Sequence, residues 1–298
     1  MTAKTIALLG TGKMGAALVD RWRAAGRDVV VWNRTSSSAE ALRGPGVRVA
    51  STAAEAAGAA DVVVASLTDG GAMCSVLIEQ GVIGAMHDGA VLVDLSTVDV
   101  PSSVAVAAAA AEHGIPYLRG AVSGSPGVMR AGQASLLLSG PATSHEAVRD
   151  VLDDLTETQI LVGDAEQARV VKLAVNSMLG ATMQILAEAV TLAEASGVTR
   201  ERFLDAVDAS VMHSRFVSYK GAALRERNYA PTFTTADMRK DVLLALGQAT
   251  SVDVVMPVAE LVLDRLDAAC AAGYAASDFL ALACVEQQAS GRSADHEA

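Results

Sequence analysis

The chain has 298 residues and a formal net charge of −11 at pH 7, and this length allows two domains with substantial cores. The acidic balance argues against nucleic acid as a partner, because a phosphate backbone attracts basic proteins. Hydrophobic residues make up 51% of the chain, but much of this excess is alanine. The richest helical stretch, residues 170–196, carries Lys, Asn, Gln and Glu, so we expect no membrane span.

The N-terminus and the cysteines indicate the compartment. A glycine-rich turn begins at residue 10, before a signal-peptide cleavage site fits. Cys74, Cys270 and Cys284 form neither a disulfide framework nor a metal-ligand spacing, and the five histidines are scattered. We therefore expect a cytoplasmic protein with reduced thiols and no metal site.

The first pattern with a chemical meaning is a glycine turn. An apolar run over residues 5–9 leads into Gly10-Thr11-Gly12-Lys13-Met14-Gly15, and a helical pattern follows. In such a strand–turn–helix unit the first glycine permits the tight turn, the second admits a pyrophosphate and the third lets the helix approach the strand. A second strand over residues 29–32 follows at βαβ spacing. The pattern predicts dinucleotide binding; a purely structural glycine turn is the less favoured alternative.

The end of the second strand bears on which dinucleotide binds. It runs into Asn33-Arg34-Thr35 and lacks the acidic residue that binds the ribose 2′-hydroxyl in NAD-preferring sites. Arg34 is suited to a 2′-phosphate, with Asn33 and Thr35 as neutral donors, although a solvated surface arginine is the alternative. We therefore expect NADP as the preferred cofactor, with NAD possible.

The order of predicted elements divides the chain. Up to residue 163, β-rich runs, the clearest at 61–66, 91–95 and 136–138, alternate with alanine-rich helical stretches. Continuous apolar strands separated by helices indicate a parallel sheet covered on both faces. This predicts a doubly wound, Rossmann-like α/β domain over 1–163. Beyond it we expect a long interdomain helix over 164–196 and an all-helical domain over 197–298, with helices at 200–209, 214–225, 236–250 and 257–272.

Three loops after predicted strands are candidate ligand sites, because ligands of open α/β sheets lie beyond the carboxyl ends of the strands. In the first two loops, Leu67, Thr68 and Thr97 are placed to contact the cofactor, although each also suits an ordinary turn or helix cap. In the third, Ser123 and Gly124 offer a hydroxyl and backbone N–H groups without bulk, which suits an anion.

The long helix and a later basic pair add candidates for proton transfer. Lys172 and Asn176 lie four residues apart and share a helical face. Burial lowers the pKa of a lysine from about 10.4, which would suit Lys172 to exchange a proton with an alcohol near neutral pH. A lysine with a packed stem and a solvated head fits the residues equally well. By themselves, Lys240 and Asp241 are more typical of a solvated charge pair.

Taken together, these patterns resemble the β-hydroxyacid dehydrogenase family, which includes 3-hydroxyisobutyrate dehydrogenases and glyoxylate or succinic semialdehyde reductases. The resemblance runs from the glycine turn through Asp94-Leu95-Ser96-Thr97 and Val122-Ser123-Gly124 to Lys172-x-x-x-Asn176 and Lys240-Asp241. It implies that Lys172 is the catalytic acid/base and that Ser123 and Gly124 hold the substrate carboxylate. It further implies that Asn176 orients the substrate and that Lys240 reaches the cofactor.

The resemblance also implies a reaction and an assembly. We expect an NADP-preferring oxidoreductase that interconverts a small anionic 3-hydroxy acid and its semialdehyde or keto acid. The expected assembly is a homodimer or homotetramer in which the helical domain serves substrate binding and dimerisation. The family commonly has Asp-Ala-Pro-Val-Ser-Gly-Gly where this chain has Arg119-Gly120-Ala121-Val122-Ser123-Gly124-Ser125, followed by Pro126. Arg119 adds a positive charge to the site if it points inward, so the identity of the substrate stays open.

Three rival interpretations remain. Imine reductases resemble the same family and share an Asn-Arg-Thr type of cofactor loop, but they generally lack a lysine at the position of Lys172. A 6-phosphogluconate dehydrogenase needs a more extended helical domain than this chain allows. A catalytically silent NADP-binding protein is the alternative from a different class, and the intact Lys172/Asn176 pair counts against it.

Overall fold

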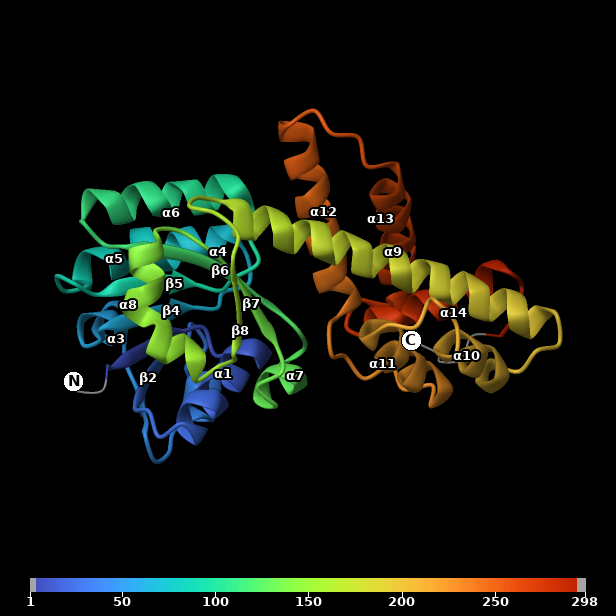
Figure 1. Ribbon diagram of the computed structural model, residues 1–298, viewed down its shortest axis with the longest axis horizontal. Helices are drawn as coiled ribbons and strands as arrows, with labels where there is room; N and C mark the ends of the chain where they lie inside the picture. The colour runs from blue at the N-terminus through green and yellow to red at the C-terminus, as the bar shows by residue number, and fades with distance from the viewer. Residues whose placement is uncertain (1–3, 294–298) are drawn as a thin grey trace. The chain divides into compact units, whose positions relative to one another are not determined.

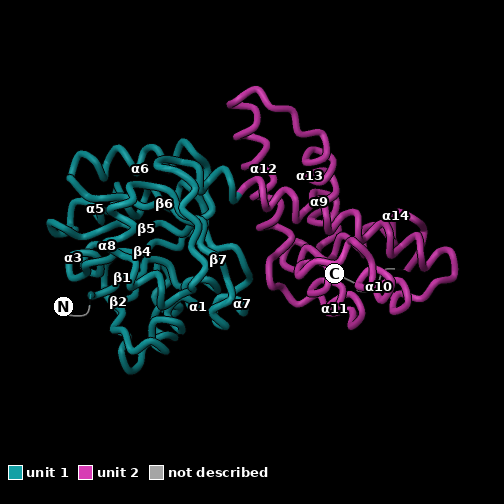
Figure 2. Tube along the Cα trace, viewed as in Figure 1, with its two compact units in different colours: residues 1–172 teal, residues 173–298 magenta. Residues whose placement is uncertain are grey.

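The computed structural model describes residues 4–293. The chain divides into two compact units, residues 1–172 and 173–298, which Figure 2 distinguishes by colour. The boundary at Lys172 lies inside one continuous helix, α9 (Gln167–Ala195).

The first unit is built on an eight-stranded sheet (Figure 1) with the order β3-β2-β1-β4-β5-β6-β7-β8. The glycine turn follows β1, and the strand order reverses between β1 and β4, which is where open α/β sheets bind their ligands. The strands are β1 (Ile6–Leu9), β2 (Val29–Trp32), β3 (Val47–Val49), β4 (Val62–Ala65), β5 (Val91–Asp94), β6 (Tyr117–Ser123), β7 (Ser135–Ser139) and β8 (Thr158–Leu161).

The sheet is parallel except at one pair. Strand β6 pairs with β7 in antiparallel register, with Val122 opposite Leu136, so the predicted parallel sheet is mostly parallel with one antiparallel pair. The connection from Ser123 to Ser135 is too short for a crossover to the same end of the sheet, which takes a dozen or more residues. It contains only the short helix α7 (Pro126–Arg130).

Both faces of the sheet are covered, because the central strands are apolar on both sides. In β1, Ile6 and Leu8 enter one buried cluster, while Ala7 and Leu9 enter the other. Helices α1 (Lys13–Ala24), α2 (Ser36–Glu40), α7 and α8 (Ala142–Asp153) contribute to the first cluster. The second cluster is formed with α3 (Ala53–Gly58), α4 (Gly70–Cys74), the π-helical turn Ser75–Glu79, α5 (Val82–Ala85) and α6 (Val100–Glu112). The predicted doubly wound domain is confirmed.

Helix starts follow local chemistry. Thr52 caps α3 by accepting a hydrogen bond from the Glu55 backbone N–H at 3.0 Å. Asp99 caps α6 in the same way, accepting from Ser102 N–H at 2.7 Å, with Pro101 in the first turn. Both caps remove unsatisfied N–H groups at a helix start.

The second unit is helical in its described part. Its helices beyond α9 are α10 (Arg200–Asp208), α11 (Arg215–Arg225), α12 (Thr235–Ser251), α13 (Pro257–Ala269) and α14 (Leu282–Ala289), with a π-helical turn at Cys270–Tyr274 and a 3-10 turn at Phe279–Ala281. They enclose one apolar core that includes Met183, Leu266, Phe279 and Cys284. The four predicted helices after α9 are present with small shifts at their ends, whereas α14 was not predicted.

By length and composition alone, α9 is apolar enough to cross a bilayer, contrary to the sequence-based expectation. Half of its most apolar window is nevertheless buried within the protein. Inside that helix Gln184 donates hydrogen bonds to Glu188 and Glu286, both at 2.8 Å. These features are typical of the core helix of a globular protein.

Candidate active site

The glycine turn has the geometry that a phosphate cradle requires. Gly10 has φ +101°, and a Cβ there would lie 2.2 Å from the Ser66 carbonyl oxygen. A Cβ on Gly15 would lie 2.0 Å from the carbonyl oxygen of Gly10, so the helix start rests directly on the turn. A Cβ on Gly12 would meet nothing within 4 Å. Gly10 and Gly15 are thus required by packing, and the space at Gly12 is open to a ligand.

The polar groups of this turn fit an anionic cofactor. Gly12 is the N-cap of α1 and offers no side-chain acceptor, and the first turn of the helix contains no acidic residue. The partial positive charge of a helix start is therefore available to a pyrophosphate. Thr11 is buried, and its Oγ1 has no hydrogen-bond partner among residues 4–293. Lys13 is exposed and Met14 is half-buried at the same turn.

The loop after β2 joins this turn through one amide side chain. Asn33 Oδ1 accepts the Thr11 backbone N–H at 3.0 Å, and Asn33 Nδ2 donates to the Thr35 carbonyl at 3.1 Å. Asn33 therefore fixes the glycine turn against this loop. Arg34 and Thr35 are both exposed. Within the described part of the chain, Arg34 pairs with no carboxylate, so its charge is available to a ligand.

The loops after β4 and β5 are joined by a residue that the sequence did not single out. Ser96 is buried, and its Oγ accepts the Leu67 backbone N–H at 2.8 Å. This places Leu67 and Thr97 on loops that are tied together at the carboxyl edge of the sheet. Leu67 is partly buried against the apolar core, whereas the neighbouring Thr68 is exposed.

The end of β6 positions the predicted substrate-binding pair. Ser123 is the last residue of the strand and Gly124 follows with φ +145°, where a Cβ would lie 3.1 Å from a Val128 methyl carbon. Ser125 caps α7 by accepting the Val128 N–H at 3.4 Å, and Pro126 begins that helix. The departure from the family pattern at Ser125 and Pro126 therefore gives this loop a helix start.

Arg119 does not supply the inward positive charge that the sequence left open. Its Nε donates to Glu166 Oε1 at 2.8 Å, with both side chains largely buried. Its guanidinium also lies over the Tyr117 ring, 4.6 Å from the centroid. Arg119 therefore neutralises the carboxylate of Glu166, the residue just before α9.

Lys172 and Asn176 lie one turn apart on α9, as predicted. Lys172 is half-buried and Asn176 is 1% exposed. Within the second unit, Asn176 Nδ2 donates to Asp241 Oδ2 at 2.5 Å. Asn176 Oδ1 is buried without a hydrogen-bond partner in the described residues. The amide is held by its nitrogen, so its oxygen is available to accept a hydrogen bond from a ligand.

Asp241 also orients Lys240, and the sequence reading missed this role. Lys240 Nζ lies 2.9 Å from Asp241 Oδ1, and Asp241 is 2% exposed. The Lys240–Asp241 pair is therefore anchored in the protein at its acidic end and is not a solvated pair. Asp241 brings together two predicted site residues, Asn176 and Lys240. A clue in the sequence was the position of Asp241 on the inner side of an otherwise apolar helix pattern.

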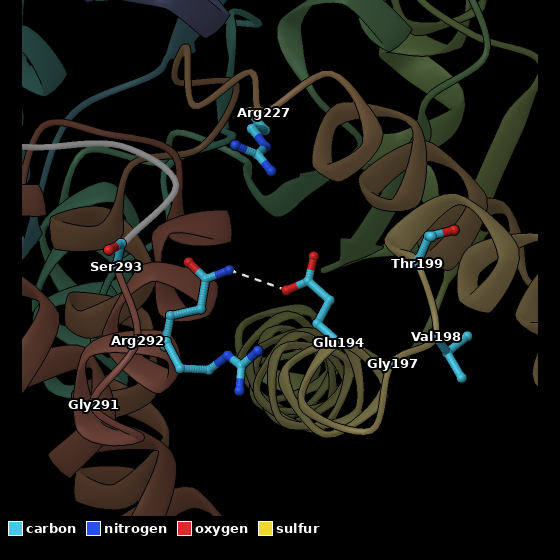
Figure 3. Close-up of a pocket in the computed structure, with 9 residues that line it drawn as sticks. Glu194, Gly197, Val198, Thr199, Arg227, Gly291, Arg292 and Ser293 are labelled. Carbon is cyan, nitrogen blue, oxygen red and sulfur yellow. Dashed lines mark hydrogen bonds between the residues drawn. The ribbon is translucent and has the colours of Figure 1, made fainter.

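An open hollow of about 760 Å³ lies elsewhere in the helical unit (Figure 3). Glu194, Thr199, Arg227 and Arg292 contribute to its walls, and Gln287 Nε2 donates to Glu194 Oε2 across it at 3.3 Å. No predicted site residue lines this hollow. The candidate site residues are, in the first unit, those of the glycine turn and the strand ends and, in the helical unit, the Asn176–Asp241–Lys240 cluster.

A dinucleotide cradle at the switch point of a doubly wound sheet, followed in the chain by a helical unit, is typical of nicotinamide-dependent oxidoreductases. Residues 5–163 match the family model described as the NAD binding domain of 6-phosphogluconate dehydrogenase. Residues 167–285 match the model described as NAD-binding of NADP-dependent 3-hydroxyisobutyrate dehydrogenase. The chain belongs to the β-hydroxyacid dehydrogenase family, whose members are NAD(P)-dependent dehydrogenases and reductases acting on CH–OH groups.

Individual relatives agree with this assignment. The chain is 30% identical over 279 residues to glyoxylate/succinic semialdehyde reductase 2 of Arabidopsis thaliana, covering 93% of this chain and 78% of that protein. It is similar to the structure of Mycobacterium tuberculosis 3-hydroxyisobutyrate dehydrogenase with L-serine, at 26% identity and a TM-score of 0.84, covering 95% and 98% of the two chains. A Bacillus cereus imine reductase is 27% identical with a TM-score of 0.62, covering 93% and 97%.

Proposed function

We propose that this protein is an NADP-preferring oxidoreductase that interconverts a small 3-hydroxy acid and its semialdehyde or keto acid, with Lys172 as acid/base. One observation carries the proposal: Asn176, one turn from Lys172, is buried with its nitrogen held by Asp241 and its oxygen unpartnered among the described residues. A buried polar atom without a partner points to a ligand when the side chain is fixed in place. The Asn176 oxygen is then able to accept a hydrogen bond from a donor group of the bound ligand.

Each predicted residue has a defined task in this reaction. A bound nicotinamide supplies or accepts the hydride. In the reductive direction Lys172 gives a proton to the substrate oxygen, and in the oxidative direction its neutral amine removes that proton. Ser123 and Gly124 bind the substrate carboxylate through a hydroxyl and a backbone N–H, while Asn176 orients the substrate. Holding the substrate at two points is what couples the proton and hydride transfers in space.

The preference for NADP is supported by the exposed loop after β2. Arg34 carries a charge that no carboxylate in the described chain neutralises, and no acidic residue ends the strand. The C-terminal family model is that of an NADP-dependent enzyme. The glycine turn, Leu67, Thr68, Thr97 and Lys240 are the other cofactor contacts that we propose.

The assembly and the location also belong to the proposal. We infer a homodimer or homotetramer, supported by three exposed apolar residues on α9, Met178, Ile185 and Leu192. They are spaced by seven residues and follow one side of the helix. The cytoplasmic location and the division into 1–163, 164–196 and 197–298 stay predictions.

The direct test combines a substrate panel with a variant of the proposed acid/base. Short 3-hydroxy acids are supplied with NADP or NAD, and glyoxylate, succinic semialdehyde and a cyclic imine are supplied with the reduced cofactors. Lys172→Ala is expected to abolish turnover while the Kd for NADPH, measured by fluorescence, stays nearly unchanged. Lys4→Ala, which removes an ion pair with Asp150, is the matched lysine control. A near-normal kcat for Lys172→Ala would disprove the assigned role.

Imine reduction is the second candidate, supported by the structural similarity to the Bacillus cereus enzyme. Turnover of the cyclic imine with no turnover of any hydroxy acid or aldehyde would favour it. Tight NADPH binding without turnover of any compound in the panel would favour a catalytically silent protein.

A further inference from the structure

Arg169 is a buried arginine near the start of α9. It is 1% exposed and lies three residues before Lys172. Arginine is almost never fully buried unless its charge is paired. Its burial therefore calls for an explanation.

The guanidinium of Arg169 binds acceptors from several parts of the first unit. Its Nη2 donates to the Asp94 carboxylate and, at 3.0 Å, to Tyr117 Oη. The other donors reach Ser96 O at 2.6 Å and Gly120 O at 2.8 Å through Nη1, and Ser103 Oγ at 3.3 Å through Nε. One side chain therefore joins the first turn of α9 to β5, to the loop after β5, to β6 and to α6.

Asp94 extends this set of hydrogen bonds to the loops that carry the proposed cofactor contacts. While one carboxylate oxygen binds Arg169, the other accepts the Ser96 backbone N–H at 3.0 Å. Ser96 Oγ in turn accepts the Leu67 N–H at 2.8 Å. A continuous set of hydrogen bonds thus runs from α9 to the loops that carry Leu67 and Thr97.

Stability alone is a poor explanation for such a pair. Burial by itself lowers the pKa of Arg169, but the Asp94 carboxylate more than compensates and keeps the guanidinium charged. Removing two charges from water is costly, and an apolar pair of similar size often stabilises a fold as well or better. What the ion pair adds is directional: a planar fork with five donors fixes its acceptors and its own helix in one relative position.

We propose that Arg169 is a positioning residue that fixes the first turn of α9, and with it Lys172, against the ends of β5 and β6. Those strand ends lead to Thr97 and Ser123, the proposed cofactor and substrate contacts. This inference rests on the proposed function, in which Lys172 is the acid/base that acts on the substrate. Small displacements of an acid/base cost large factors in rate, which is why a rigid attachment is useful there.

The test is Arg169→Lys, which keeps the charge but replaces the fork by a single ammonium group. We expect kcat to fall about 10- to 100-fold, since a displacement on the order of 1 Å can cost about 100-fold. The KM for substrate and the Kd for NADPH should change much less than kcat. Hydrogen exchange in the absence of substrate should become faster at the amides of residues 94–97 and 167–172.

Arg200→Lys is the matched control. Arg200 is also buried, at 4% exposure, and within the helical unit it pairs with Glu194 and donates to the Leu224 carbonyl. Its replacement should lower the Tm without a selective loss of kcat. Tyr117→Phe removes one hydrogen-bond partner of Arg169 and is the substitute variant if Arg169→Lys does not fold. We expect Tyr117→Phe to lower kcat by a smaller factor than Arg169→Lys and to leave KM unchanged.

Two outcomes separate this inference from the proposed function. If Arg169→Lys matches Arg200→Lys in kcat and leaves hydrogen exchange at residues 94–97 and 167–172 unchanged, Arg169 is not a positioning residue and the proposed function stands. If the wild-type protein turns over nothing in the panel, the proposed function fails. In that case the exchange measurement alone decides whether Arg169 fixes the helix start.

Discussion

Asn176 Nδ2 and Asp241 Oδ2 are 2.5 Å apart, which joins α9 to α12 inside the helical unit. The second oxygen of Asp241 lies 2.9 Å from Lys240 Nζ. One buried carboxylate therefore holds the proposed substrate-orienting amide and the proposed cofactor-binding ammonium. The two predicted roles are coupled through a residue that touches neither ligand in our proposal.

This coupling predicts different effects for two substitutions at Asp241. Asp241→Asn keeps an oxygen acceptor for the Asn176 amide but removes the charge that holds Lys240, so the Kd for NADPH should rise more than kcat falls. Asp241→Ala removes both interactions, and kcat should fall by a further factor of about 10 to 100, as expected for a misplaced substrate. Steady-state kinetics and fluorescence titration separate the two. Equal changes of kcat and of the Kd for NADPH in the two variants would contradict the separate roles that we assign to the two Asp241 interactions.

The glycine turn and the central strands were predictable from sequence because their chemistry is local. Edge strands were missed for a physical reason: β8, Thr158–Leu161, is largely exposed and shows no continuous apolar run. Strand β6 was expected only as the strand before the Ser123–Gly124 loop and was not among the clearest apolar runs, because it carries Arg119, whose charge is neutralised by Glu166, 47 positions away. Arg169 and Asp94 are 75 positions apart, and neither residue alone indicates a buried pair. Long-range pairing of charges leaves no local pattern.

Arg34 should determine the choice of cofactor. Its exposed, unneutralised guanidinium is suited to a 2′-phosphate. A hydrogen bond to a charged group contributes about 1.5–3 kcal/mol, so Arg34→Ala should raise the KM for NADP roughly 10- to 100-fold. The KM for NAD should stay nearly constant. Arg43→Ala, which removes an exposed arginine paired with Glu40, is the control. Equal losses with both cofactors would refute the assignment.

Two alanine substitutions in the glycine turn should have opposite consequences. Gly12 has φ −65° and open space beside it, so Gly12→Ala should keep the Tm and weaken NADPH binding by filling ligand space. Gly15→Ala brings a Cβ against the carbonyl oxygen of Gly10 and should destabilise the fold by about 1–3 kcal/mol. Thermal melts with and without NADPH test both. Unchanged NADPH affinity in Gly12→Ala would place the phosphates elsewhere.

The apolar stripe on α9 predicts the oligomeric state. Met178, Ile185 and Leu192 are 60% or more exposed and recur every seven residues on α9, and exposed apolar residues grouped on one face are typical of a protein interface. Ile185→Glu should convert the wild-type oligomer into monomers in sedimentation velocity at micromolar concentration. Val211→Glu, at a fully exposed apolar position outside α9, should leave the mass unchanged. A monomeric wild type would rule out the interface.

The helical unit should lose stability in acid through Asp278. This buried carboxylate accepts Lys220 Nζ at 2.6 Å and Thr232 Oγ1 at 2.6 Å. Burial by itself raises the pKa of Asp278, but the Lys220 ammonium and the hydrogen bonds outweigh it and hold the pKa below its ordinary value. A carboxyl whose pKa is lower in the folded state stabilises the fold above its unfolded pKa, about 3.9. That contribution is lost as the pH falls through the folded pKa.

Urea unfolding at pH 7 and at several values below pH 4 measures this effect. At pH 7 Asp278→Asn should lower the free energy of unfolding by about 3–5 kcal/mol, because it leaves Lys220 buried without its counter-charge. As the pH falls below 4 and through the folded-state pKa of Asp278, the wild type progressively loses the same ion pair, so the difference between the two proteins should shrink. A double variant that also carries Lys220→Met removes the stranded charge and should regain part of the stability at pH 7. A difference between wild type and Asp278→Asn that stays constant across this pH range would show that Asp278 does not titrate with folding.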